Sequence, residues 1–213
     1  MGPEAAASTR AQGGGAALTR LAIAWVVLGA VAFVASMILA IDRYRLLADP
    51  NTELGCDISP FVACGPVMES PAGALFGFPN PLLGVACFMI MITSGMALLA
   101  GARLRPWFWI GMQIGLTLAG VFITWLQTQT LYVIESLCIW CMVVWAMTIP
   151  LIVLTTAHAL AYGRFGNTRG RRLGRWMQEY RWMIIVLWYL VVILAIALKF
   201  YREFALMWFG VAL

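Results

Sequence analysis

The chain has 213 residues, of which 63% are hydrophobic and only 11% are charged, and its net charge is +5. A soluble domain is typically about 45–50% apolar and about 25% charged, so this chain has too few polar side chains to cover a water-facing globule. The composition excludes a disordered chain, a disulfide-rich mini-protein and an ordinary cytosolic enzyme. It predicts an all-α integral membrane protein, because lipid would cover most of the surface and helices satisfy their own backbone hydrogen bonds there.

Five stretches are long and apolar enough to be transmembrane helices, each of which needs about 20 residues. They cover residues 21–41, 82–102, 107–126, 136–157 and 182–198. The first stretch is too long for the apolar region of a cleaved signal peptide and runs directly into Asp42, so we expect it to be an anchor. The Ala- and Gly-rich residues 1–19 show no periodicity and are predicted to be a disordered cytoplasmic leader.

The positions of Lys and Arg predict the orientation of these helices. With the N-terminus inside, the inner segments hold ten basic residues and the outer segments hold four. Positive charge favours the cytoplasmic side, so the loop 42–81 and the tail 199–213 are expected to be extracytoplasmic. The basic loop 158–181 is then interpreted as a cytoplasmic anchor that touches anionic lipid, and no nucleic acid is expected as a partner.

This orientation brings four of the five cysteines to the outer side, where disulfides form and persist. Cys56 and Cys64 lie in the outer loop, and Cys138 and Cys141 form a CxxC motif at the outer end of the fourth span. The start of a helix stabilises a thiolate, and residues three apart share a helix face, so this CxxC suits a reducible disulfide. The remaining cysteine has no spacing partner and is interpreted as a small apolar residue.

The cysteines have two alternatives to redox chemistry, a zinc site and a structural disulfide pair. A zinc site fits poorly, because Cys-x7-Cys is not the usual ligand spacing, and the sole histidine, His158, lies at the inner end of the fourth span. No metal site is therefore predicted. A purely structural disulfide pair is the other alternative to thiol redox chemistry. The carboxylate of Glu135 near the CxxC would oppose thiolate formation.

Two outer thiol pairs, one in a polar loop and one at the membrane surface, suggest an electron relay. The loop pair can meet a soluble dithiol, while the CxxC can meet a lipid-soluble two-electron acceptor such as a quinone. A quinone ring suits an apolar, aromatic pocket with one or two polar contacts. Asn80, between two prolines at the start of the second span, could donate a hydrogen bond to a quinone carbonyl. It could equally cap the second helix.

Together these motifs resemble the vitamin K epoxide reductase (VKOR) family over residues 21–150. The motifs are Cys56-x7-Cys64, Ser70, the segment from Gly77 to Gly84 (GFPNPLLG) and Cys138-Ile-Trp-Cys141. The resemblance implies a four-helix catalytic core around a quinone, within residues 20–157. It also implies an outer loop that forms a half-helix cap, and a fifth helix of the kind found in bacterial members.

The resemblance implies a role for each cysteine of the two pairs. Cys141 would face the quinone, with Cys138 as its partner. Cys64 would pair with Cys138 during electron transfer, and Cys56 would exchange with an external dithiol.

Three further residues match functional positions of the family. Asn80 takes the position of the quinone-contacting amide, and Ser70 that of a loop serine that supports the cap. Trp145 stands where the animal enzymes have Tyr, and its indole can donate a hydrogen bond to a quinone but cannot accept one.

The family resemblance also suggests a partner and a function. Many bacterial members carry a fused thioredoxin-like domain, whereas only residues 199–213 follow the fifth span here. We therefore expect a separate, extracytoplasmic, DsbA-like thioredoxin-fold protein as the dithiol partner. The expected function is quinone-dependent thiol–disulfide oxidation in the inner (plasma) membrane, in support of disulfide bond formation, with menaquinone or ubiquinone as cofactor.

Three alternatives to this function were considered. The first is epoxide or quinone reduction in the animal sense. The second is a non-enzymatic membrane assembly subunit stapled by disulfides, for which the small-residue pair Gly111-x3-Gly115 would suit helix packing. A DsbB-type reductase is disfavoured, because its cysteine pairs occur in the reverse order.

Overall fold

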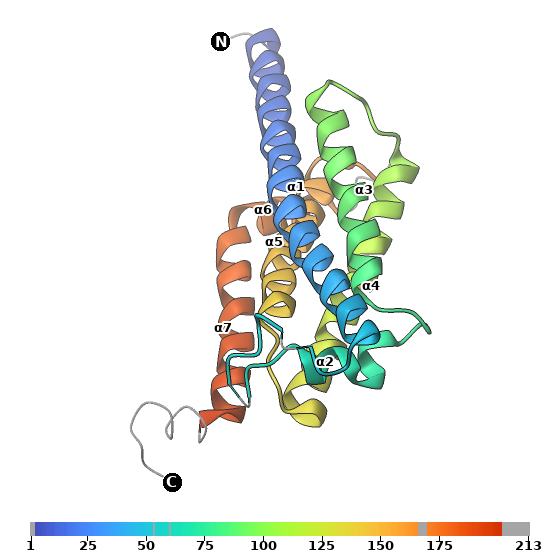
Figure 1. Ribbon diagram of the computed structural model, residues 1–213. Coiled ribbons are helices and arrows are strands. Elements are labelled where there is room, and N and C mark those ends of the chain that lie inside the picture. Colours follow the sequence, from blue (N-terminus) through green and yellow to red (C-terminus); the bar gives the residue numbers. More distant parts are fainter. Residues whose placement is uncertain (1–2, 53, 60, 166–169, 202–213) are drawn as a thin grey trace.

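The computed structural model describes residues 3–52, 54–59, 61–165 and 170–201, and these form a bundle of long helices (Figure 1). In chain order the elements are α1 (Pro3–Ala48), α2 (Gly65–Glu69), the 3-10 turn η1 (Pro71–Ala74), α3 (Pro81–Leu99), α4 (Pro106–Gln129), the π-helical turn η2 (Thr130–Ile134), α5 (Ile139–Ala161), α6 (Arg171–Glu179) and α7 (Arg181–Lys199). Within the described ranges, the only β-type pairing is two isolated bridges that involve Val62. The predicted all-α fold is confirmed.

The five predicted spans are confirmed as helices. α1, α3, α4 with η2, α5 and α7 are each long and apolar enough to cross a membrane, so the chain is a multi-pass membrane protein. The fourth span starts at Ile139 rather than at residue 136, and it continues through Pro150 to Ala161. A proline inside a membrane helix is tolerated because neighbouring groups can satisfy the backbone carbonyl that it leaves free.

The N-terminal segment differs from the expectation. Residues 1–19 were expected to be a disordered leader, but α1 begins at Pro3. Alanine, which is abundant in this segment, is the best helix former. Extending an existing helix also avoids the cost of nucleating a new one. A lack of hydrophobic periodicity therefore did not exclude a helix.

Proline and glycine mark several helix ends. Pro81 and Pro106 start α3 and α4, at a position where the missing N–H group costs nothing. Gly101 and Gly163 follow the ends of α3 and α5 with φ angles of 88° and 61°, a conformation that favours glycine. At both ends the next backbone N–H groups bond to carbonyls of the last turn, which terminates the helix in a Schellman motif.

α1 packs along α3 and α5, and α4 packs on α5. The approach of α1 and α3 is close: a Cβ atom on Gly95 would lie 2.9 Å from the carbonyl oxygen of Ala22. Gly111 and Gly115 of α4, by contrast, have nothing within 4 Å of such an atom. The spacing of that pair suggested helix packing, but the close contacts occur elsewhere in the bundle.

Two of the apolar clusters in the described part of the chain divide the bundle along its length, and a third, smaller one surrounds Leu131, Leu137 and Phe200. The main core surrounds the tilted ring pair of Trp25 and Trp109, whose centroids are 5.5 Å apart, and it reaches Leu116 on α4 and Leu151 on α5. The second, which we name the cap cluster, is formed by Leu39, Leu46, Leu54, Cys56, Cys64, Val67, Met68 and Cys138. We call the end of the bundle that carries the cap cluster the cysteine end.

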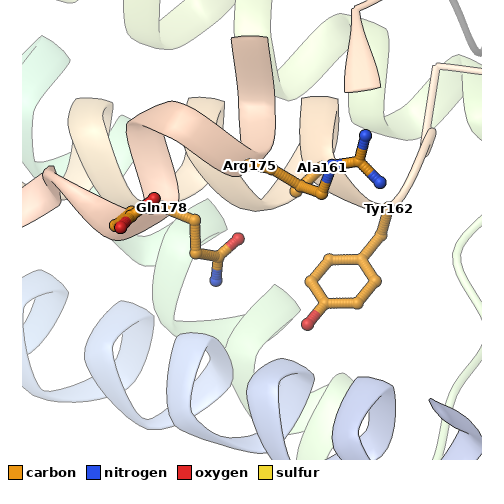
Figure 2. A pocket seen from close by; sticks show the side chains of 5 residues that line it. Ala161, Tyr162, Arg175 and Gln178 are labelled. Carbon is orange, nitrogen blue, oxygen red and sulfur yellow. The ribbon is translucent and has the colours of Figure 1, made fainter. Parts of the chain in front are cut away.

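At the opposite end, the segment expected to be a basic loop, 158–181, contains the helix α6. This helix packs tightly on the end of α5, because a Cβ atom on Gly174 would lie only 2.2 Å from the backbone nitrogen of Ala161. A surface pocket of about 360 Å³ lies where the two helices meet (Figure 2), and it is lined by Ala161, Tyr162, Arg175, Gln178 and Glu179. This pocket is separated from the cysteines by the length of α5.

Candidate thiol redox site

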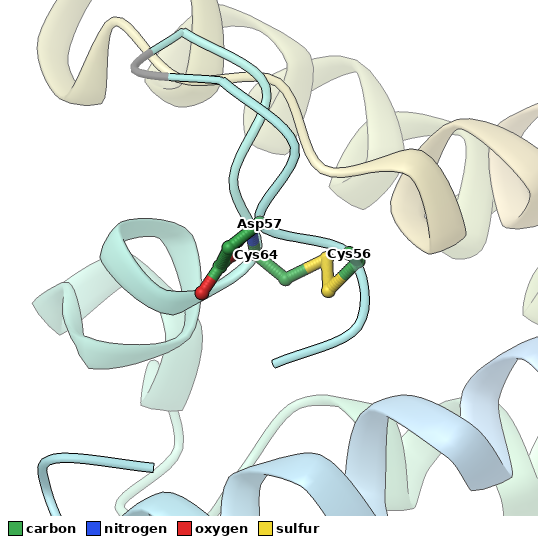
Figure 3. Close-up of side chains that lie close together, drawn as sticks. All are labelled: Cys56, Asp57 and Cys64. Carbon is green, nitrogen blue, oxygen red and sulfur yellow. Dashed lines mark hydrogen bonds between the residues drawn. A yellow bond between two sulfur atoms is a disulfide. The ribbon is translucent and has the colours of Figure 1, made fainter. Parts of the chain in front are cut away.

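The two loop cysteines are joined in a disulfide (Figure 3). Their side chains are buried, with 4% of Cys56 and none of Cys64 exposed. Asp57 lies beside Cys64, and its Oδ1 accepts the backbone N–H groups of Cys64 at 2.7 Å and Gly65 at 3.3 Å. These two bonds fix Cys64 at the first turn of α2. Sequence reasoning missed Asp57, for which the signal was its position directly after Cys56.

Cys138 meets this disulfide although it lies 74 residues further along the chain than Cys64. The Sγ atoms of Cys138 and Cys64 are 3.4 Å apart, and Cys138 is fully buried. Attack of a thiolate on a disulfide sulfur requires this kind of approach. The contact therefore makes exchange between the loop pair and the CxxC chemically feasible without a large rearrangement.

Two hydrogen bonds hold the loop against the segment that precedes α5. The backbone N–H of Leu137 donates to the carbonyl of Phe61 at 2.8 Å. The hydroxyl of Ser136 donates to the carbonyl of Ala63 at 3.0 Å, and Ser136 is itself buried. Both bonds lie beside the Cys64–Cys138 contact, so they keep the two sulfur atoms at a short distance.

The CxxC lies at the start of α5, as predicted. Cys138 is the N-cap residue, just outside the membrane-spanning segment, and its Sγ accepts the backbone N–H of Cys141 at 3.4 Å. The hydrogen bond from the Cys141 side chain lowers the pKa of the Cys138 thiol, and the backbone N–H groups of Cys141 and Trp140 act in the same direction. Burial and the negative charge of Asp57 oppose them. On balance the pKa of Cys138 is lowered, which makes the thiolate, the reactive form, easier to reach.

The charge of Glu135, expected to oppose that thiolate, has a partner in the structure. Its carboxylate forms an ion pair with Lys199 at 2.5 Å, across 64 residues of sequence. Lys199 ends α7, so the fifth helix supplies the partner. Glu135 also adopts a left-handed conformation with φ of 57°, which turns the chain between η2 and α5.

Asn80 is the N-cap residue of α3, and its side chain organises the turn before that helix. Its Nδ2 donates to the carbonyl of Ala72 at 2.6 Å, and its Oδ1 accepts the N–H of Leu75 at 3.1 Å. Its side chain forms no cap bond to α3, so the predicted position at the helix start is confirmed and the side-chain cap is not formed. The amide is buried and keeps one N–H free for a further acceptor. Contact with a quinone stays a prediction.

Ser70 lies between the two short elements that form the expected half-helix cap. Its hydroxyl donates to the carbonyl of Val67 in α2 at 2.8 Å, and its own carbonyl accepts the N–H of Gly73 in η1. The side chain thus joins the end of α2 to the start of η1. Because Val67 and Met68 belong to the cap cluster, this joint supports the cover over the disulfide.

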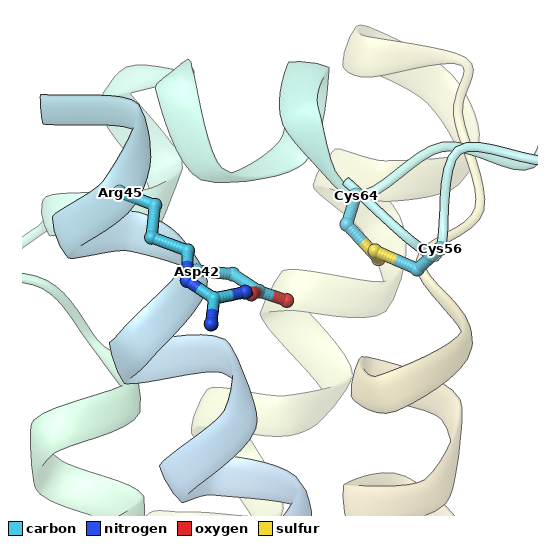
Figure 4. A network of polar contacts seen from close by, with 4 residues as sticks. All are labelled: Asp42, Arg45, Cys56 and Cys64. Carbon is cyan, nitrogen blue, oxygen red and sulfur yellow. A yellow bond between two sulfur atoms is a disulfide. The ribbon is translucent and has the colours of Figure 1, made fainter. Parts of the chain in front are cut away.

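Cys141 and Trp145 occupy one face of α5, because residues four apart in a helix are neighbours. Cys141 is half-buried and packs against the cap cluster, and Trp145 is 4% exposed. The end of α1 lies on the side of the bundle that carries the Cys56–Cys64 disulfide (Figure 4). There the buried Asp42 pairs with Arg45 at 3.5 Å, one turn from Leu39 and Leu46 of the cap cluster.

Gln127 is a second residue that sequence reasoning missed. Because of the polar residues 127–130, the third span was predicted to end at residue 126, but α4 continues to Gln129. Gln127 is only 8% exposed, and its Nε2 has no hydrogen-bond partner among the described residues. It shares the buried face of α4 with Trp109, Leu116 and Ile123. The signal in the sequence was a glutamine on the helix face that carries Trp109, Leu116 and Ile123, where an apolar residue would be expected.

One group in the described part of the chain brings three potential metal-ligand atoms together, namely Cys56, Asp57 and Cys64, within 4.8 Å of one another. Two of these atoms are the sulfurs of the disulfide, and only a thiolate is a good metal ligand. With Cys56 and Cys64 joined in a disulfide, these three residues are therefore arranged for thiol–disulfide exchange and offer no pair of thiolates to a metal ion.

Comparison with known proteins agrees with the site geometry. A family model described as the vitamin K epoxide reductase family matches residues 23–156, a range that contains every candidate site residue. No curated protein matches the chain.

Proposed function

Because the chain belongs to the vitamin K epoxide reductase family, which implies disulfide and quinone redox chemistry in a membrane, we propose that it is a quinone-dependent thiol–disulfide oxidoreductase. It passes electrons from a reduced thioredoxin-fold protein to a membrane quinone and thereby supports disulfide formation. The observation that carries this proposal is the 3.4 Å approach of the Cys138 sulfur to the Cys56–Cys64 disulfide.

The first exchange takes place at the loop pair. A thiolate of the reduced partner attacks Cys56, the Cys56–Cys64 bond breaks, and the second partner thiol releases the partner as a disulfide. The partner loses two electrons, and the loop pair gains them as two thiols. Cys56 is only 4% exposed. The loop around it must therefore move locally before a partner thiol can reach the sulfur.

The second exchange moves the electrons to the CxxC. The Cys64 thiolate attacks Cys138 of an oxidised Cys138–Cys141 pair and releases Cys141. Cys56 then attacks Cys64, which restores the loop disulfide and releases Cys138. The structure has a Cys56–Cys64 disulfide beside free Cys138 and Cys141. This arrangement corresponds to the state that follows the second exchange, with the CxxC reduced.

The residues near Cys141 suit a quinone. Cys141 packs against the apolar cap cluster, Trp145 lies one turn further along α5, and Trp145 and Asn80 carry N–H donors of the kind that a quinone carbonyl accepts. Cys141, Asn80 and Trp145 are the residues that we propose to hold the ring, which is that of menaquinone or ubiquinone. When bound there, the quinone supplies an acceptor for two electrons and two protons.

The proposed location is the inner (plasma) membrane, with a cytoplasmic N-terminus. The excess of basic residues in the segments assigned to the inside supports this orientation. The cysteine end then faces the extracytoplasmic space, where a separate DsbA-like protein would be the dithiol partner.

The test is quinone reduction by the purified full-length protein, with a reduced thioredoxin-fold dithiol as donor. The wild type is expected to form quinol, and Cys141→Ser is expected to lose this activity. Cys87→Ser is the matched control, because Cys87 is a free, exposed cysteine of α3 outside the site, and it should keep full activity. Turnover of Cys141→Ser at the wild-type rate would contradict the proposal.

A further inference from the structure

Gln127 is a buried polar side chain that the relay described above does not use. Its amide nitrogen has no hydrogen-bond partner in the described part of the chain, and the residue is 8% exposed. Burying an N–H group without a partner is unfavourable, so nearly all such groups in folded proteins are paired. A buried, unpaired amide on the inward face of α4 therefore points to a ligand that accepts hydrogen bonds.

The depth of Gln127 in the bundle follows from a second glutamine on the same helix. Gln113 exchanges hydrogen bonds with Thr156 of α5, with distances of 2.9 and 3.2 Å, so these two residues are level. α4 and α5 run in opposite directions. Fourteen residues along α4, about four turns, bring Gln127 back to nearly the same face. Fourteen residues before Thr156 on α5 lies Met142, next to Cys141. Gln127 is therefore level with Cys141.

The apolar clusters place Gln127 at the same depth. Leu116, three turns earlier on α4, belongs to the main core, whereas Cys138 and Cys141 of α5 contribute to the cap cluster. Gln127 thus lies where the main core gives way to the cap cluster, at the level of the thiol that would deliver electrons.

We propose that the Gln127 amide donates a hydrogen bond from Nε2 to a carbonyl oxygen of the quinone beside Cys141. This inference rests on the proposed function and adds a binding residue to it. The Cys138 and Cys141 thiols give up two electrons and two protons as their disulfide forms, and the quinone takes both up to become the quinol. Gln127 neither gains nor loses a proton, but its N–H stabilises the negative charge that develops on the oxygen.

Gln127 has more N–H groups available for this role than Asn80 among the described residues. One N–H of Asn80 already bonds Ala72, and its carbonyl oxygen accepts from Leu75. Replacing Asn80 would therefore disturb the turn before α3 together with any quinone contact. Neither N–H of Gln127 has a partner among the described residues, so its replacement can change quinone binding without disturbing the fold.

The test compares Gln127→Leu with Gln113→Leu in the full-length protein. Quinone affinity is measured by quenching of tryptophan fluorescence with short-chain ubiquinone and menaquinone, and thermal unfolding is measured without quinone. We expect Gln127→Leu to weaken binding about tenfold and to leave the unfolding temperature unchanged or higher, because an unpaired buried amide is removed. Gln113→Leu should lower the unfolding temperature, because it breaks the bond to Thr156, and keep wild-type affinity.

Two results would overturn the assignment. One is an affinity of Gln127→Leu within twofold of wild type. The other is a loss of thermal stability without quinone equal to that of Gln113→Leu, which would show that the Gln127 amide has a partner in the protein. Gln127→Met, which has nearly the same shape, serves as a second variant should leucine prevent folding. A wild-type protein that neither binds nor reduces quinone would contradict the proposed function itself.

Discussion

Cys138 is the residue on which the two cysteine pairs converge. Its sulfur lies 3.4 Å from Cys64 of the loop disulfide and also accepts the N–H of Cys141. It is fully buried, so water and foreign thiols are kept away from the sulfur that receives the electrons in the second exchange. One side chain can therefore connect a loop that meets a soluble protein with a thiol in the first turn of a membrane helix.

The lowered pKa of Cys138 gives the first prediction. The hydrogen bond from the Cys141 side chain is the largest cause of the lowering, so Cys141→Ala should raise the pKa and move thiolate formation on Cys138 to higher pH. Cys141→Ser keeps a hydroxyl donor, so the pKa of Cys138 in this variant should be closer to the wild-type value. The measurement is the pH dependence of Cys138 alkylation in the reduced protein, read by peptide mass spectrometry. Identical profiles for Ala and Ser would contradict this account.

Asp57 should shift the pKa of Cys138 in the direction opposite to the Cys141 hydrogen bond. Its negative charge raises the pKa of Cys138, so Asp57→Asn, which keeps an oxygen to accept the N–H of Cys64, should move the alkylation midpoint to lower pH. Asp49→Asn is the matched control, because Asp49 is an exposed carboxylate before the same loop and should leave the midpoint unchanged. A midpoint that rises in Asp57→Asn would show that the carboxylate acts on Cys138 in some other way.

At the scale of elements, the bundle depends on the close approach of α1 and α3. Helices in lipid associate through packing, and small residues allow their backbones to come near one another. Gly95 occupies such a point, where a Cβ atom would meet the carbonyl of Ala22 at 2.9 Å and Val26 Cγ2 at 2.9 Å. Because the first obstacle is backbone, relief requires the helices to move apart.

Gly95→Ala is therefore expected to lower the free energy of unfolding by about 1–3 kcal/mol, as overpacking does in other cores. Gly111→Ala is the control on α4, where nothing lies within 4 Å. It should be neutral or stabilising by up to about 1 kcal/mol, because alanine favours the helix. Unfolding in a mixed-detergent titration measures both values. Equal effects of the two substitutions would show that α1 and α3 do not meet at Gly95.

α7 lies beyond the residues that the family model matches, and two polar contacts join it to the core besides the apolar packing of Ala195 and Ile196 near Leu131. The Tyr189 hydroxyl donates to the carbonyl of Ala146 in α5 at 2.5 Å, and Lys199 pairs with Glu135 before the CxxC. The second contact links the fifth helix to the cysteine end. It also compensates a carboxylate close to the reactive thiols.

At the scale of the whole molecule, the sequence was sufficient to predict the five long helices and the position of the CxxC at a helix start. Long apolar stretches must be helical in lipid, so hydropathy alone located the five spans. The CxxC was correctly predicted at the start of a helix, because the apolar stretch begins there. Cys56 and Cys64 were grouped as one thiol pair because they share the outer loop. The approach of Cys64 to Cys138 came from the family resemblance, since nothing in the spacing determines which residues of distant segments meet.

Contacts between distant segments could not be predicted. The ion pair of Glu135 with Lys199 joins residues 64 apart, and that Gln127 has no partner among the described residues depends on every helix around it. Asn80 had two reasonable interpretations, and its contacts show a third, in which it holds the turn before α3. Side-chain amides can donate and accept in many directions, so their roles depend on the fold around them.

The most direct test of the relay is whether Cys64 and Cys138 can form a disulfide with each other. In the double variant Cys56→Ser, Cys141→Ser these two thiols lose their other partners, and Cys87 remains as an internal control. After mild oxidation of the folded protein, peptide mass mapping without reduction should find a Cys64–Cys138 disulfide and a free Cys87. If Cys64 and Cys138 both stay free, or pair with Cys87 instead, electrons cannot pass between the loop pair and the CxxC by this route.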